Sequence, residues 1–233
     1  VLGFLGVDPA IRMHVAVATS LVTIIPTSIS SARAHHRRGA VDVEVVKRWA
    51  VFVLVGALLG AWIAAQVHSR VLAGVFATLA LLVAAKMVFF AESRNLTDSV
   101  PRAPWVIAIP TAIGCFSSMM GIGGGTFSVM TLTLFNEPFL RAVGTAALFG
   151  LVISLPGTIG FILTGLDDPR LPPGSLGYVN LLGLAAIAPT TVLMAPLGAR
   201  IAHGFSAKKL SILFGLFLVV VSLRLFYRAL MPA

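Results

Sequence analysis

The chain has 233 residues, of which 58% are hydrophobic and 11% charged, and its mean hydropathy is +1.00. This composition excludes a soluble domain and indicates a polytopic helical membrane protein, because a spanning helix needs about 20 mainly apolar residues. Seventeen Lys and Arg against eight Asp and Glu give a net charge of +9. The basic residues cluster between hydrophobic stretches, as loop charges do, so we set nucleic acid aside as a partner. The lone Cys115 excludes an intrachain disulfide and a multi-cysteine metal site.

The hydrophobic stretches predict six spanning helices and one interrupted segment. In chain order, the helices lie at about 12–31, 45–67, 71–91, 140–164, 176–202 and 207–230, with the interrupted segment at about 104–135. Gly56 and Gly60 form a small-xxx-small pair, the pattern of a helix-packing face. Pro189 and Pro196 predict that the 176–202 helix bends or breaks.

The interrupted segment contains Gly121-Ile122-Gly123-Gly124-Gly125. Each glycine costs a helix about 1 kcal/mol relative to alanine. In hydrocarbon, the freed backbone groups need partners from protein or ligand. Residues 126–135 can restart a helix whose first N–H groups point back at the glycines, and such helix N-termini bind anions. The segment therefore predicts an anion site made of backbone amides and hydroxyls.

The glycines have two other interpretations. Gly121 and Gly125 form a small-xxx-small pair that would pack helices, although packing alone does not need Gly123 and Gly124. A phosphate-binding loop is disfavoured, because no Lys-Ser/Thr follows the glycines. Nearby hydroxyls have a simpler alternative as well, which is a bond to a carbonyl of their own helix.

The two halves of the chain show an internal repeat. At an offset of 130, matches include Pro26 with Pro156, and at an offset of 138 the Gly60-Ala61 pair falls on Gly198-Ala199. We therefore divide the chain into a first membrane repeat at 1–98 and a second at 99–233. The repeat partner of the Gly121 element would lie about nine residues before Val1, so we expect the first glycine element to precede this sequence.

Loop charges predict that the two repeats are inverted. The loop at 33–48 holds five basic residues, whereas its repeat partner at 165–175 holds one Arg and two Asp. The positive-inside rule then makes the first loop cytoplasmic and the second periplasmic. For these loops to lie on opposite sides, the 104–135 segment must return to the side where it began. Its second arm, at about 16 Å, is too short to span, so we expect a re-entrant hairpin.

A Gly-x-Gly-Gly-Gly element at a helix break, followed by a span with an Ala-rich start and an interior Pro156, resembles the TauE/SafE family of sulfite exporters. Ala18-Thr19-Ser20 also fits the family pattern, whereas Ala147-Leu148-Phe149 departs from it at the equivalent place in the second half. The resemblance implies a multi-pass protein of the bacterial inner membrane that moves sulfite, organosulfonates or related sulfur anions.

We therefore expect a transporter that exports a small sulfur oxyanion or sulfonate, not an enzyme, with no cofactor and no metal. The alternative is a membrane scaffold or assembly subunit whose glycines only pack helices. The expected partners are the small anion and the lipid bilayer, and homo-oligomer formation is left open. Pro26 and Pro156 are the candidate hinges. The candidate substrate-binding residues are Gly121, Gly123, Gly124, Gly125, Thr126, Ser128, Ser117, Ser118, Thr19, Ser20 and Thr145.

Overall fold

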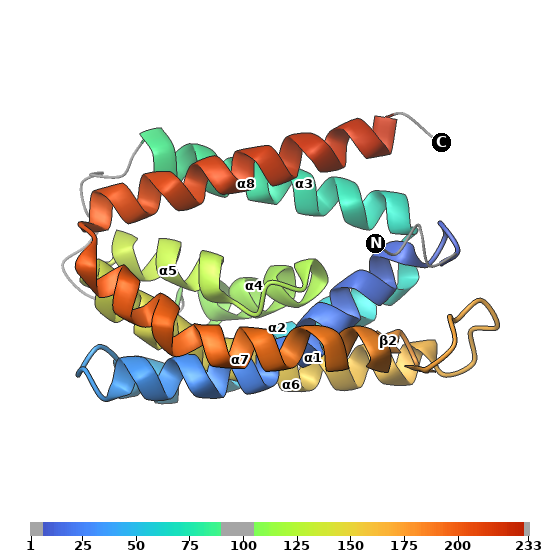
Figure 1. The fold of residues 1–233 in the computed structure, drawn as a ribbon, viewed down its shortest axis with the longest axis horizontal. Helices are drawn as coiled ribbons and strands as arrows, with labels where there is room; N and C mark the ends of the chain where they lie inside the picture. The colour runs from blue at the N-terminus through green and yellow to red at the C-terminus, as the bar shows by residue number, and fades with distance from the viewer. Residues whose placement is uncertain (1–6, 90–104, 231–233) are drawn as a thin grey trace.

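A computed structural model describes residues 7–89 and 105–230, and these are almost entirely helical (Figure 1). The elements are α1 (Arg12–His36), α2 (Val43–Gln66), α3 (Ser69–Phe89), α4 (Trp105–Met120), α5 (Gly125–Leu134), α6 (Phe139–Gly165), β1 (Ser175–Leu176), β2 (Val179–Asn180), α7 (Leu181–Gly204) and α8 (Ala207–Leu230). Within this part of the chain, six helices are long and apolar enough to cross a membrane, while α4 and α5 are shorter. The prediction of an all-α polytopic membrane protein is confirmed.

Two predicted boundaries were wrong. The basic loop was placed at 33–48, but α1 continues to His36 and α2 begins at Val43, because Asp42 caps α2 by accepting a hydrogen bond from the Val45 N–H. The sixth predicted span was started at 176, but 175–180 instead form a small antiparallel hairpin. Asn180 then caps α7 by accepting from the Gly183 N–H at 2.8 Å.

Helix α7 continues through both of its prolines without a break. Pro196 has no N–H, so it cannot donate to the Val192 carbonyl four residues earlier. The Ser30 hydroxyl of α1 donates to that carbonyl at 3.0 Å, and the Thr27 hydroxyl donates to the Thr191 hydroxyl at 2.8 Å. Side chains of α1 therefore supply the partner that the proline removes.

Helix α4 packs along α2 in the same direction through glycines. A β-carbon added at Gly56 would strike the Thr111 carbonyl, and one added at Gly60, one turn on, would strike the Cys115 carbonyl. Gly114 is equally close to Val53. The predicted packing role of Gly56 and Gly60 is confirmed. One turn further along α2, the contact also moves one turn further along α4, so the two helices run parallel.

Helix α5 runs back toward the point where α4 began. Its last turn leads to Phe135, whose ring lies 6.4 Å from the ring of Trp49 in the first turns of α2. Near its start, Phe127 lies 6.3 Å from Phe116 in the last turn of α4. The two short helices form the expected re-entrant hairpin, which lies between the α3–α8 layer and the layer of α1, α6 and α7 (Figure 1).

The α1–α2 loop and the α6–α7 loop lie at opposite ends of the helices, at the left and right of Figure 1. We call these the α1–α2 end and the α6–α7 end. This placement agrees with the re-entrant hairpin. The inverted repeat itself, and the division at 98/99, stay predictions.

The sidedness of the two ends is testable by cysteine labelling. In a Cys115→Ala background, Arg37→Cys should be shielded from an impermeant thiol reagent on intact cells, and Ser175→Cys should react. The positive-inside rule is the physical reason. Equal labelling of the two positions would contradict the predicted orientation.

Candidate functional site

The α4–α5 turn begins with the hydrogen bonds that end α4, and Gly121 adopts the positive φ that they require. Gly121 has φ +66°, its N–H donates to the Ser118 carbonyl, and the Ile122 N–H donates to the Ser117 carbonyl, each at 3.2 Å. This pair of bonds is the Schellman motif, which satisfies the carbonyls at the end of a helix. Helix α4 therefore ends within the protein with two of its terminal carbonyls paired.

The start of α5 lacks such partners. Gly123 and Gly124 have φ +62° and +79°, and Gly124 is the N-cap of α5 without a side-chain cap. Among the residues that the structure describes, no acceptor is recorded for the N–H groups of Gly125, Thr126 and Phe127, whereas the Ser128 N–H donates to the Gly124 carbonyl at 2.9 Å. Three amides at a helix start are thus free to bind an anion.

This turn lies midway along the flanking helices. A β-carbon at Gly123 would lie 2.6 Å from the Cγ2 atom of Ile24, the central residue of α1, and one at Gly124 would strike Ile153, near the middle of α6. Any larger residue at these positions must displace a neighbouring side chain while adopting a positive φ. The turn is therefore fixed in place by close contact with both helices.

Helix α1 also holds the turn by a hydrogen bond. The Ser20 hydroxyl donates to the Gly121 carbonyl at 2.6 Å. At Gly121 an added β-carbon would come within 3.0 Å of the Val17 backbone, so only glycine lets the two chains approach this closely. The predicted residue Ser20 thus contacts the glycine turn directly.

Buried hydroxyls without partners flank the glycines in α4 and α5, and a further one lies in α6. The Oγ atoms of Ser117, Ser118 and Ser128 belong to side chains with 0% exposure and make no hydrogen bond, and the same holds for the Oγ1 atom of Thr158, at 5% exposure. The alternative that these serines bond to carbonyls of their own helices is wrong for all three. An unsatisfied buried hydroxyl costs about 1–3 kcal/mol, so a ligand that accepted these bonds would recover that free energy.

Two predicted residues do not belong to this cluster. Thr19 accepts a hydrogen bond from the Asn180 N–H at 3.0 Å, toward the α6–α7 end. Thr145 accepts from the Asp42 N–H at 2.8 Å, at the α1–α2 end. Both hydroxyls hold a helix start, and neither contacts the glycine turn in the structure.

Sequence reasoning missed three features of α1 and α6 that bound the site. Ser28 is buried, and its hydroxyl lies against Gly150, which also approaches the Gly123 carbonyl. Gly157 leaves room for the Ser118 hydroxyl. The offset of 130 that pairs the two prolines also pairs Ser28 with Thr158. This repeat match is the sequence signal that could have identified Ser28.

The candidate hinges lie close to the turn. Pro26 follows Ile24 by two residues, Pro156 follows Ile153 by three, and both prolines lie inside continuous helices. Each removes one helical hydrogen bond at the depth of the glycines.

Among the described residues, Lys86 of α3 is a charged side chain that reaches α5, and it lies away from the turn. Lys86 Nζ lies 3.4 Å from the Thr133 hydroxyl, in the last turn of α5, roughly 13 Å from Gly124 at the helical rise per residue. The candidate site therefore consists of neutral donors: amides at a helix start and hydroxyls.

The fold and this turn define a multi-pass membrane protein with a re-entrant hairpin at mid-depth. Residues 1–225 match the family described as "Sulfite exporter TauE/SafE", and the chain belongs to this family. A "Probable membrane transporter protein" of Haemophilus influenzae is 30% identical over 97% of this chain and 86% of its own length. "Probable membrane transporter protein YdhB" of Bacillus subtilis is 26% identical over 72% of this chain and 76% of its own length. No solved structure matches the chain.

The family is one of membrane transporters, and the bacterial inner-membrane location predicted from the sequence fits it. The resemblance to the TauE/SafE family that the glycine motif indicated is confirmed. The residues that bind substrate stay a prediction.

The absence of a hydrogen bond at the Ser128 hydroxyl can be tested by measuring the free energy of unfolding without a ligand. We expect Ser128→Ala to raise the free energy of unfolding by about 1–3 kcal/mol, because it removes a buried unsatisfied group. The matched change Ser20→Ala should lower it by about 1 kcal/mol, since it removes the bond to Gly121. Thermal unfolding in detergent measures both. Equal destabilisation by the two changes would contradict the unpartnered state of Ser128.

Proposed function

We propose that the protein exports a small sulfur oxyanion or organosulfonate across the bacterial inner membrane. The substrate binds at the α4–α5 turn, with its oxygens accepting from the N–H groups of Gly125, Thr126 and Phe127. The observation that carries the proposal is that unpaired amides at the start of α5 and unpartnered serine hydroxyls at the adjoining ends of α4 and α5 belong to one mid-depth turn. Membership of the sulfite exporter family supports the choice of substrate class.

The donors suit this class of anion chemically. Sulfite and sulfonates present three oxygens around one sulfur atom, each with lone pairs that accept from N–H and O–H groups. Amides at a helix N-terminus add the favourable end of the helix dipole. Binding by dipoles does not neutralise the anion's charge. The membrane potential therefore contributes to the free energy of moving the anion across the membrane.

Pro26 and Pro156 would allow the passage of substrate. Both helices that contact the turn lack one hydrogen bond near it, so each bends there at a smaller free-energy cost than elsewhere. Bending α1 opens the turn toward one end, and bending α6 opens it toward the other. Alternating bends would expose the site to each side in turn.

A flux assay in liposomes tests the substrate class. The purified protein should move sulfite or a sulfonate, with sulfate and thiosulfate measured in parallel and protein-free liposomes as the blank. If none of these anions moves faster than in protein-free liposomes, the transport proposal fails and the scaffold alternative gains support.

The glycine turn itself is tested by Gly124→Leu. We expect loss of anion flux, because a side chain there meets Ile153 and requires a positive φ. Gly198→Leu is the matched control, since Gly198 has open space around it, and it should retain flux. Lys86→Gln should have a small effect, because the site uses dipoles. Size exclusion checks folding of each variant. Normal flux in Gly124→Leu, or loss confined to Lys86→Gln, would place the site elsewhere.

Transport should carry net charge. A membrane potential of about 100 mV acts on one charge with about 2.3 kcal/mol, which corresponds to roughly fifty-fold accumulation of a monovalent anion at equilibrium. A potassium gradient with valinomycin sets the potential in the same liposomes. Anion movement that ignores the sign of the potential would show that a co-transported ion compensates the charge.

A further inference from the structure

The α6–α7 loop is anchored to three helices at its end of the protein. The Tyr178 N–H donates to the Phe161 carbonyl of α6 at 3.3 Å, and Gly177, with φ +54°, fits against Ile162. The Asn180 N–H donates to Thr19 of α1, and its side chain caps α7. Residues 177–180 of the hairpin therefore lie buried against α1 and α6, and α7 starts from the hairpin.

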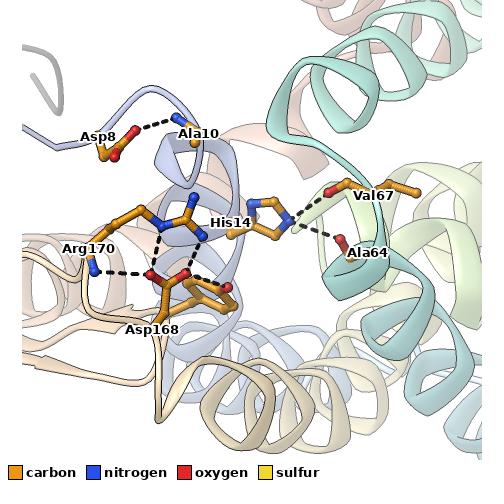
Figure 2. Close-up of polar contacts among 8 residues, drawn as sticks. Asp8, Ala10, His14, Ala64, Val67, Asp168 and Arg170 are labelled. Atoms are coloured by element: carbon orange, nitrogen blue, oxygen red, sulfur yellow. Dashed lines mark hydrogen bonds and ion pairs between the residues drawn. The ribbon is translucent and has the colours of Figure 1, made fainter.

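Tyr178 joins this hairpin to a cluster of polar side chains. The tyrosine is 7% exposed, and its ring lies 5.1 Å from the ring of His14. Its hydroxyl donates to Asp168 Oδ2 at 3.0 Å, and Asp168 is held by Arg170 through two bonds at 2.8 and 2.9 Å. Asp168 and Arg170 lie on one side of His14 in Figure 2.

His14 connects that cluster to α2. It is 4% exposed, and its Nε2 atom lies 3.0 Å from the Ala64 carbonyl and 3.1 Å from the Val67 carbonyl, on the opposite side from Asp168 (Figure 2). Both partners are acceptors, so Nε2 carries the proton. The Nδ1 atom is buried and has no partner in the structure. His14 is thus neutral here, with one nitrogen available for a second proton.

We propose that His14, Tyr178, Asp168 and Arg170 form a lock that closes the α6–α7 end, and that protonation of His14 at Nδ1 releases it. A proton there creates a buried cation whose new N–H has no acceptor, which is unfavourable in a low-dielectric site. Once the hairpin lifts, water reaches the ring and solvates that cation. The closed state binds fewer protons than the open state, so acid favours opening.

The neighbouring groups keep their charge over the range in which histidine titrates. The bonds from Arg170 hold the pKa of Asp168 at about 2, so this carboxylate stays ionised. Burial raises the pKa of Tyr178, so the phenol stays neutral. At the end of α2, His14 contacts the Ala64 and Val67 carbonyls. The charged groups that act on His14 are Asp168 and Arg170 from the loop. Asp8 acts on Arg170 in turn, and Arg12, the first residue of α1, donates to the Val7 carbonyl.

The role of this lock rests on the proposed function, because a transporter must open its two ends in turn. Its test does not require transport. In a Cys115→Ala background, Val179→Cys, at a position that is 1% exposed, reports lifting of the hairpin. Leu176→Cys, at a position that is 46% exposed in the same hairpin, corrects for the effect of pH on thiol reactivity.

We expect the ratio of alkylation rates at Val179→Cys and Leu176→Cys to rise several-fold from about pH 7.5 to about pH 5.5. His14→Gln keeps an N–H donor for the α2 carbonyls but does not titrate, so the rise should vanish. His68→Gln, which changes an exposed histidine at the α2–α3 junction, should leave it intact. Tyr178→Phe removes the bond to Asp168 and should raise the ratio at both pH values.

Two outcomes would overturn the lock: a constant ratio in the unmodified cluster, or a rise that persists in His14→Gln. If His14→Gln does not fold, an unchanged ratio in Tyr178→Phe overturns it instead. Anion flux in the same liposomes is a separate readout. Absent flux with a pH-dependent ratio refutes the transport proposal and leaves the lock standing, whereas flux with a constant ratio does the reverse.

Discussion

A backbone that leaves helical geometry inside a membrane must find partners for its N–H and C=O groups, and the α4–α5 turn depends on this constraint. The Schellman bonds pair two carbonyls of α4, and Ser20 pairs the carbonyl of Gly121. The first three amides of α5 have no hydrogen-bond acceptor among the described residues. Helices α1 and α6 approach the turn closely, and that approach requires glycine at 121, 123 and 124, where the turn meets Val17, Ile24 and Ile153.

The hydroxyls divide into two groups with different energetic consequences. Thr19, Thr27, Ser30 and Thr145 are bonded to groups on other elements and stabilise the arrangement of the helices. The serines beside the turn have no partner and together oppose folding by an estimated ~3–9 kcal/mol. Such a cost is most easily tolerated where a bound ligand pairs the hydroxyls, so the unpartnered hydroxyls support the proposal that this turn binds a ligand.

The glycine turn and the helices were predictable because each depends on local sequence: apolar length for the spans, and clustered glycines for the break. The re-entrant hairpin followed from loop charges and from the short second arm. Thr19 and Thr145 were assigned to the site because they are hydroxyl residues in the two helices expected to face the glycines. Which way a hydroxyl points depends on the rotation of its helix against its neighbours, and the sequence does not contain that angle. The hairpin at 175–180 was missed for a related reason, since it is very short and is held in place by contacts with α1 and α6, which are distant in sequence.

Polar contacts connect α1 with four other parts of the protein at successive depths. His14 reaches the end of α2, Thr19 the start of α7, Ser20 the glycine turn, and Thr27 and Ser30 the middle of α7. Sliding α1 along its axis by even one residue would break all of these contacts together. A tilt centred on Pro26 would instead strain them unequally, most at His14 and least at Thr27 and Ser30. Because Ile24 lies much closer to Pro26 than His14 does, such a tilt displaces Ile24 and the Gly123 that it contacts far less than it displaces His14.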